Sequence, residues 1–186
     1  KNTIPAEGNE NISIGALDEI DVESIGLLDE QKGGFGINMW EGSERAQIED
    51  LLSRLPTHVR SPAAHELIKT VLLSTATAPT KNNASSNLLR TRLSVLADLG
   101  EFESFLELLA TVPESARTGE IKKLKANVFL LMGDTKRACE LTLNQVREAD
   151  SLYWQKALFV CQLTNDETSA AALSLNLLRE QLVESD

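Results

Sequence analysis

The chain has 186 residues, of which 42% are hydrophobic, so it is long enough to bury the core of one domain. Aromatic residues make up only 4%, while Leu and Ala are abundant, and this composition favours helices over strands. The formal net charge of -10 gives no long-range attraction to nucleic acid or to anionic membranes. No apolar run reaches the roughly 18 residues that a membrane span requires. We therefore expect no nucleic-acid partner and no membrane insertion.

Residues 1–40 carry most of this negative charge. They contain two lysines and eight acidic residues, a net charge of -6, whereas the other 146 residues share -4. Apolar residues are scattered singly among polar ones, which is typical of extended or disordered chain. We predict an acidic, extended or partly disordered arm over residues 1–40. Phe35 and Trp40 are its predicted anchors, because an apolar ring in a polar segment is stabilised when it covers part of a core.

From residue 41 the pattern changes to successive helices, which predict one helical-repeat domain over residues 41–186. Ser43 is the expected N-cap of the first helix, which Pro56 ends, and Ser61 followed by Pro62 begins the second. A polar connector follows. Six further helices are predicted at about 84–98, 101–111, 116–131, 134–148, 151–163 and 167–183. Because the connections are short, neighbouring helices must fold back antiparallel.

The breaks between these later helices recur at a regular spacing. Gly100, Gly133 and Asn165 stand at corresponding corners, 33 and 32 residues apart. Residues predicted to be buried stand five positions after each corner (Phe105, Ala138, Ala170) and four positions before it (Leu96, Phe129, Cys161). A period of 32 to 34 residues with two helices per unit is typical of an α-solenoid, in which each hairpin buries its face against the next.

The stretch LLMGDTKRACEL, residues 130–141, resembles the middle of a tetratricopeptide repeat. Gly133 occupies the helix corner, Asp134 is placed to cap the second helix, and Ala138 occupies the small packing position. The resemblance implies an all-α fold, a right-handed α-solenoid of antiparallel helical hairpins that presents a curved surface to a protein or peptide partner. Two other stretches, GLLDEQKGGFGINMW and YWQKALFVCQL, are similar to segments of uncharacterised exported bacterial proteins with helical repeats.

The two cysteines, Cys139 and Cys161, lie on neighbouring predicted helices. The midpoint of their positions is residue 150, in the corner between these helices, so both should lie roughly 16 Å of helix rise from the turn and face each other. Two interpretations remain open: a pair of core cysteines that act as small hydrophobic residues, or a disulfide. A disulfide would indicate an extracytoplasmic location such as a bacterial periplasm, whereas free thiols would suit the cytoplasm.

A basic cluster lies on either side of the corner at Gly133 in this acidic chain. It consists of Lys122, Lys123, Lys125, Lys136 and Arg137. The cluster is a candidate surface for an acidic partner or for the acidic arm of the same chain. An ordinary solvated helix face is the alternative interpretation.

No residue pattern points to catalysis, a metal or a cofactor. His58 and His65 are separated by Pro62, so they do not share a helix face, and further zinc ligands are not evident. The acids between residues 18 and 30 lack the order of a calcium loop and are interpreted as a solvated charge run. We predict a non-catalytic protein-interaction or scaffold module within a larger assembly. The alternatives are an accessory domain of an extracytoplasmic enzyme, and a structural domain clasped by its own arm.

Overall fold

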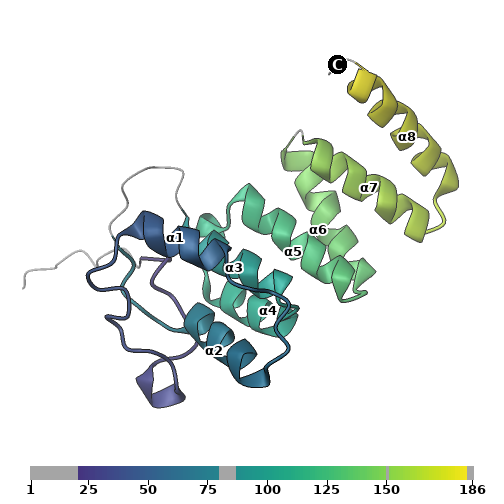
Figure 1. Ribbon diagram of the computed structural model, residues 1–186. Helices are drawn as coiled ribbons and strands as arrows, with labels where there is room; N and C mark the ends of the chain where they lie inside the picture. Colours follow the sequence, from purple (N-terminus) through teal and green to yellow (C-terminus); the bar gives the residue numbers. More distant parts are fainter. Residues whose placement is uncertain (1–20, 80–86, 150, 184–186) are drawn as a thin grey trace, which may run out of the picture.

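The structure is a computed structural model that describes residues 21–79, 87–149 and 151–183. This part of the chain is all-α and contains eight α-helices, two short 3-10 helices and one isolated β-bridge, between Leu28 and Ser74. The α-helices, shown in Figure 1, are α1 (Arg45–Ser53), α2 (Pro62–Leu73), α3 (Leu88–Asp98), α4 (Phe102–Thr111), α5 (Gly119–Leu131), α6 (Thr135–Glu148), α7 (Leu152–Thr164) and α8 (Thr168–Val183). The 3-10 helices are η1 (Glu30–Lys32) and η2 (Glu114–Ala116).

Two of the predicted helix starts are confirmed by their caps. The Ser61 hydroxyl accepts a hydrogen bond from the Ala64 amide at 3.4 Å, with Pro62 at the first position of α2. The Asp134 carboxylate accepts one from the Arg137 amide at 3.0 Å and so caps α6. The prediction for Ser43 is wrong, because α1 begins one residue later, after Glu44. The predicted start of the next helix, at residue 84, lies outside the described residues.

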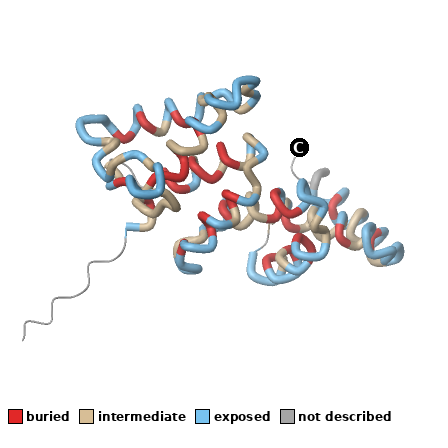
Figure 2. The backbone as a smooth tube through the Cα atoms, turned by 90° about the horizontal axis from the view of Figure 1, so that it is seen from below, coloured by how far each residue is buried: buried red, intermediate tan, exposed pale blue. Residues whose placement is uncertain are grey.

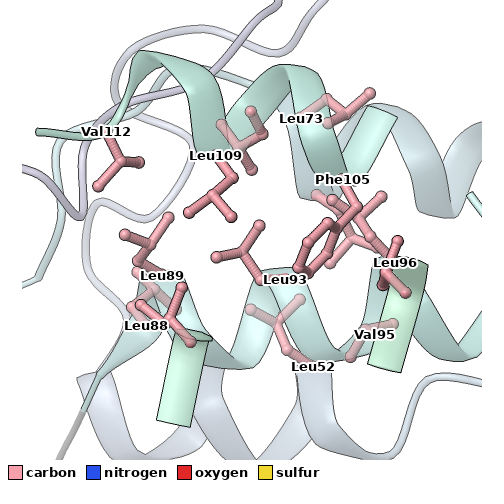
Figure 3. Close-up of a cluster of buried hydrophobic side chains, with 14 of the residues drawn as sticks. Leu52, Leu73, Leu88, Leu89, Leu93, Val95, Leu96, Phe105, Leu109 and Val112 are labelled. Atoms are coloured by element: carbon pink, nitrogen blue, oxygen red, sulfur yellow. The ribbon is translucent and has the colours of Figure 1, made fainter. Parts of the chain in front are cut away.

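The main core forms around α3, which packs against α1, α2, α4 and α5. Leucines of α3 face Phe105 and Leu109 of α4, as Figure 3 shows. Beyond α5 the helices pack in sequence, α5 on α6, α6 on α7 and α7 on α8. The buried residues of α6, α7 and α8 are not part of the main core cluster. Figure 2 shows the buried positions on the inward faces of the helices, with exposed positions at the corners.

The corners between paired helices share one backbone geometry. The residue in the left-handed region is Gly100 (φ 78°), Gly133 (φ 75°) or Asp166 (φ 60°), so the corners lie 33 residues apart. In each case the following amide donates to a carbonyl near the end of the preceding helix; these bonds are Glu101 to Leu96 at 3.0 Å, Asp134 to Phe129 at 2.8 Å and Glu167 to Gln162 at 2.8 Å.

The third corner therefore lies at Asp166, and its placement at Asn165 is wrong by one residue. Asn and Asp both tolerate the left-handed region, so the sequence signal did not distinguish them. The shift also moves the packing position from Ala170, which is half-buried, to Ala171, which is 2% exposed. Phe105 and Ala138, at the corresponding positions of the other two hairpins, are buried as predicted.

Replacing Gly133 with alanine is expected to lower the free energy of unfolding by about 1 kcal/mol, because an L side chain is disfavoured at φ 75°. Gly119→Ala is the matched control. A Cβ added at either glycine meets no atom within 4 Å, and Gly119 is not in the left-handed region. We expect Gly119→Ala to leave stability unchanged or slightly raised. Urea unfolding of both variants measures the difference, and equal losses would contradict the backbone explanation.

Residues 21–40, predicted to be part of an extended arm, pack against the helical body. The amides of Leu27 and Leu28 donate to the Leu73 carbonyl at 2.8 and 3.0 Å, and the Thr75 amide donates to the Leu28 carbonyl at 2.7 Å. Gly26 permits this approach, because a Cβ there would lie 2.4 Å from backbone atoms of Ser74 and Thr75. The other half of the predicted arm, residues 1–20, lies outside the described residues.

Candidate functional site

The predicted arm anchors occupy different environments. Trp40 is half-buried and packs against the main core, together with Ile25, Leu27 and Leu28. Phe35 is 38% exposed and lies beside a hollow of about 360 Å³ that Ile37 and Thr75 also line. Its amide donates to the Ser74 hydroxyl at 2.9 Å, so the backbone rather than the ring holds this stretch in place.

The five residues of the predicted basic cluster do not all contact the same partners. The Lys122 ammonium lies 3.6 Å from the Glu148 carboxylate on α6. The Lys123 ammonium lies 2.8 Å from Glu120 on its own helix. Lys136 is exposed. Only Lys125 and Arg137 meet at a common feature, the ring of Phe129.

Lys125 and Arg137 cover the Phe129 ring and line a groove with it. The Lys125 ammonium lies 5.6 Å and the Arg137 guanidinium carbon 4.6 Å from the ring centroid, which places both cations within cation–π range. The groove has a volume of about 390 Å³ and is bounded by α4, α5, α6 and Arg117 from the loop after η2. Its apolar residues are Leu106, Leu109, Ala110 and Phe129, and its cations are Arg117, Lys125 and Arg137. We call this site the basic groove.

Two of the three cations of the basic groove are held by neighbouring groups. The Arg117 guanidinium donates to the Val112 carbonyl at 3.1 and 2.9 Å and to the Glu114 carboxylate at 2.5 Å. The Arg137 guanidinium donates to the carboxylate of Asp134, the same side chain that caps α6. Both side chains are therefore fixed before any ligand arrives.

Lys125 is the least neutralised of the three cations. Among the described residues, no carboxylate lies within 4.0 Å of its ammonium group. Burial lowers the pKa of Lys125, and the nearby charge of Arg117 lowers it further. An incoming carboxylate would relieve this electrostatic cost, because an opposite charge favours the protonated amine. The basic groove thus favours an anion beside an apolar group.

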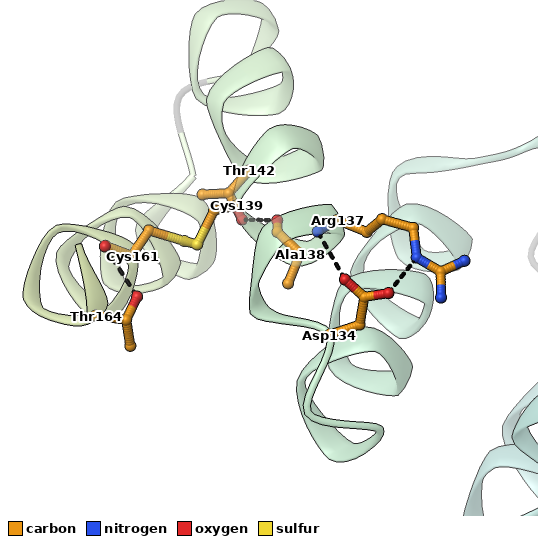
Figure 4. The surroundings of a disulfide bond; sticks show 7 residues. All are labelled: Asp134, Arg137, Ala138, Cys139, Thr142, Cys161 and Thr164. Carbon is orange, nitrogen blue, oxygen red and sulfur yellow. Dashed lines mark hydrogen bonds and ion pairs between the residues drawn. A yellow bond between two sulfur atoms is a disulfide. The ribbon is translucent and has the colours of Figure 1, made fainter.

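Cys139 of α6 and Cys161 of α7 are joined by a disulfide, with a Cα–Cα distance of 5.5 Å (Figure 4). The two residues are 6% and 4% exposed. The hydroxyls of Thr142 and Thr164 beside them donate to backbone carbonyls of their own helices, at 2.8 and 3.0 Å. Of the two interpretations that the sequence left open, free core cysteines or a disulfide, the structure contains the disulfide. The bond links the α5–α6 helix pair to the α7–α8 pair.

A buried charged cluster was missed by the sequence analysis. Glu23, interpreted as part of a solvated charge run, is 2% exposed, and its carboxylate accepts hydrogen bonds from Arg45 at 2.6 Å and from the Leu88 amide at 3.1 Å. Arg92, also 2% exposed, lies nearby on α3. Its guanidinium donates to the backbone carbonyls of Leu72 at 2.7 Å, Glu23 at 3.2 Å, Ile25 at 2.7 Å and Ser74 at 3.0 Å.

This cluster fastens the segment around Glu23 to the end of α2 and the start of α3. Burial lowers the pKa of Arg92 to about 10, so its guanidinium still carries a charge at neutral pH. A sequence signal for it existed, because Arg92 stands on the apolar face of its helix, between the buried residues Leu88, Leu89, Val95 and Leu96. All three nitrogen atoms of this guanidinium donate to backbone carbonyls, so we assign it a structural role.

His65 takes part in a link between α2 and α4, and His58 is exposed. His65 Nε2 lies 2.7 Å from one oxygen of Glu101, and the Lys69 ammonium lies 2.9 Å from the other. Burial raises the pKa of Glu101, but hydrogen bonds from His65 and Lys69 outweigh it and hold the pKa below its ordinary value. The Ser104 hydroxyl donates to the same carboxylate at 3.1 Å, so Glu101 joins α2 to the first turn of α4.

Within the described ranges, no three His, Cys, Asp or Glu side chains are grouped so that they could hold a metal ion. In the same part of the chain, none of the helices is both long and apolar enough to cross a membrane. The chain matches no protein-family model, no curated protein and no solved structure. A functional assignment therefore has to come from the geometry of the basic groove.

Proposed function

We propose that this chain is a non-catalytic binding module whose basic groove takes an acidic segment of a protein partner. The observation that carries the proposal is the convergence of Arg117, Lys125 and Arg137 around an apolar floor in a chain of net charge -10. Elsewhere the negative charge of the chain repels an acidic partner, so association is directed to this locally positive site. The apolar floor then favours a segment in which hydrophobic residues stand beside carboxylates.

We further propose that the hairpins α3–α4, α5–α6 and α7–α8 form a right-handed α-solenoid of the tetratricopeptide type. The equal spacing of 33 residues between the corners supports this, as do the buried packing residues five positions after each corner. In such arrays neighbouring hairpins jointly form extended binding surfaces, and the basic groove is likewise shared between α4 of one hairpin and α5 and α6 of the next.

An extracytoplasmic location, such as a periplasm, belongs to the same proposal. The disulfide between Cys139 and Cys161 supports it, because such bonds persist in oxidising compartments. The alternative role, a structural domain clasped by its own N-terminal part, is favoured by one observation, the set of four carbonyls that Arg92 binds. The segment around Glu23 is not among the residues that line the basic groove, so the structural role and the binding role can coexist.

Binding is tested with a fluorescent peptide in which glutamates flank each leucine, and with its lysine counterpart as the negative probe. We expect the acidic probe to bind with an affinity that falls as salt is raised. Lys125→Met should weaken binding about tenfold, the loss that corresponds to 1.4 kcal/mol. Lys136→Met is the matched control, because it removes the same charge from an exposed position next to Arg137.

Three results would count against this function. They are binding of the lysine probe at equal affinity, an equal loss of affinity in Lys125→Met and Lys136→Met, and the absence of any binding. Thermal unfolding of both variants separates a loss of binding from a loss of folding.

A further inference from the structure

The corner between α5 and α6 carries an exposed apolar group that the other two corners lack. Leu130, Leu131 and Met132, at the end of α5, are 38%, 67% and 38% exposed. The positions that correspond to Leu131 at the other corners are also exposed, and they hold Asp98 and Thr164. Single exposed leucines are ordinary, but three large apolar residues side by side at one corner indicate a contact with another molecule.

An unpaired cation follows this apolar group. Lys136, in the first turn of α6, is exposed, and no carboxylate in the described part of the chain lies within 4.0 Å of its ammonium group. We call the surface formed by Leu130, Leu131, Met132 and Lys136 the corner tip. A surface that receives the corner tip has to combine an apolar hollow with a carboxylate.

The hollow beside Phe35 has both features, and we call it the acidic hollow. Its volume is about 360 Å³, and Phe35 and Ile37 line it together with Asp29 and Glu30. A Cβ built on Gly36 would lie 2.5 Å from Glu30 Oε1, so only a glycine leaves room for the carboxylate at this place. The described ranges contain no cation within 4.0 Å of that carboxylate.

Hydrogen bonds hold the walls of the acidic hollow in place. The Phe35 amide donates to the Ser74 hydroxyl at 2.9 Å, and the Thr77 amide donates to the Ile37 carbonyl at 2.8 Å. Both apolar residues therefore stand on backbone that is fixed to the segment after α2. A surface that is already ordered loses little conformational entropy when it binds, which favours its use as a receptor.

The corner tip and the acidic hollow lie far apart on the molecule. In Figure 1, η1 projects beyond α2, whereas the corner between α5 and α6 lies on the side toward α7 and α8. The helices between them are packed together, α2 on α3, α3 on α5 and α5 on α6. The corner tip therefore does not reach the acidic hollow of its own chain, and a contact between the two surfaces has to join two molecules.

We propose that the corner tip of one copy of this chain occupies the acidic hollow of a second copy. Leu131 enters beside Phe35 and Ile37, and the Lys136 ammonium lies against the Glu30 carboxylate. The two unpaired charges are opposite, which fixes the orientation of the contact, while the net charge of -10 on each copy disfavours the approach of other surfaces. Because the two surfaces differ, the copies join head to tail.

Sedimentation velocity over a range of protein concentrations tests this contact. The average mass of the unaltered chain is expected to rise with concentration without stopping at a dimer. Leu131→Asp alters the corner tip, and Ile37→Asn removes an apolar wall of the hollow without adding a charge. Each should weaken self-association at least about tenfold. Leu51→Asp is the matched control, because Leu51 of α1 is 66% exposed and lies on neither surface, so this variant should associate like the unaltered chain.

A mixture of the two variants identifies the surfaces that meet. The Ile37→Asn chain keeps its corner tip and the Leu131→Asp chain keeps its hollow. We therefore expect the mixture to form a 1:1 dimer and nothing larger, although each variant alone stays monomeric. A mixture that stays monomeric, an unaltered chain that is monomeric at every concentration, or self-association of Ile37→Asn through a contact between two tips would overturn the inference.

A charge exchange at two exposed positions keeps the test informative if Ile37→Asn does not fold. Glu30→Lys and Lys136→Glu should each weaken self-association, and the double variant should restore it, because the two charges are again opposite. Failure of the double variant to associate would overturn the pairing of Glu30 with Lys136. The acidic hollow lies outside the basic groove, so Glu30→Lys should leave binding of the acidic probe unchanged, and the proposed function stands or fails separately.

Discussion

Replacing Arg92 with methionine is expected to lower the free energy of unfolding by about 3–5 kcal/mol. The substitution keeps most of the side-chain volume but removes the donors to four backbone carbonyls in a site that is 2% exposed. Each buried carbonyl left without a partner costs about 1–3 kcal/mol. Urea unfolding gives the difference, and a loss below about 1 kcal/mol would contradict the role assigned to Arg92.

Two further variants make this measurement specific. Arg90→Met lies on the exposed side of the same helix, and we expect it to change stability by no more than about 0.5 kcal/mol. Arg92→Lys keeps the positive charge but loses the planar guanidinium that binds several carbonyls at once. Its free energy of unfolding should therefore lie between those of the native chain and Arg92→Met. This variant remains informative if the methionine variant does not fold.

The same variants have a local readout. Arg92 binds the carbonyls of Glu23 and Ile25, next to the point where the Leu27 and Leu28 amides donate to Leu73. Amide hydrogen exchange at Leu27 and Leu28 should therefore quicken in Arg92→Lys under native conditions. Unchanged exchange there would show that this segment is held without Arg92.

Reduction of the disulfide between Cys139 and Cys161 is expected to lower stability by about 3 kcal/mol. The bond closes a loop with a sequence separation of 22, and chain-entropy arguments assign a loop of that size an effect of this order. Because α6, α7 and α8 contribute no residue to the main core cluster, we expect them to unfold before α1 to α5 once the bond is broken.

Urea unfolding with and without reductant measures this effect. A double variant, Cys139→Ser with Cys161→Ser, serves as the control, because its unfolding should no longer respond to reductant. Two reactive thiols in the denatured, unreduced protein would show that the bond is absent, and the argument for an oxidising compartment would fail with it.

The disulfide and the basic groove meet on one helix. α6 carries Arg137, which covers Phe129, and two residues later Cys139, which is bonded to α7. Ala138 between them is 1% exposed and packs inside the hairpin. The bond therefore limits the movement of the helix that supplies one cation of the groove, so the two features are mechanically connected.

Local signals in the sequence were sufficient to predict that these α-helices exist, though not the residue at which α1 begins, and to predict two of the three corners. Ser61 with Pro62 and Asp134 are caps that act within three residues, and a glycine such as Gly133 marks a left-handed corner by itself. The sequence also predicted that the two cysteines face each other, because their positions are symmetric about one turn. The third corner was missed by one residue, because Asn and Asp both tolerate the left-handed region and the sequence does not show which of the two adopts it.

The basic groove and the buried charges depend on contacts between residues far apart in the sequence, and no local sequence pattern predicts such contacts. Arg92 binds carbonyls 67 and 69 positions away in the sequence. Its neighbours in the sequence indicate that it lies on an apolar helix face, but they do not indicate which groups accept its hydrogen bonds. Arg117, Lys125 and Arg137 come from a loop and two helices, and their approach depends on how α4, α5 and α6 pack. Secondary structure follows from interactions within one helical turn, whereas a site built by distant segments exists only after they have packed together.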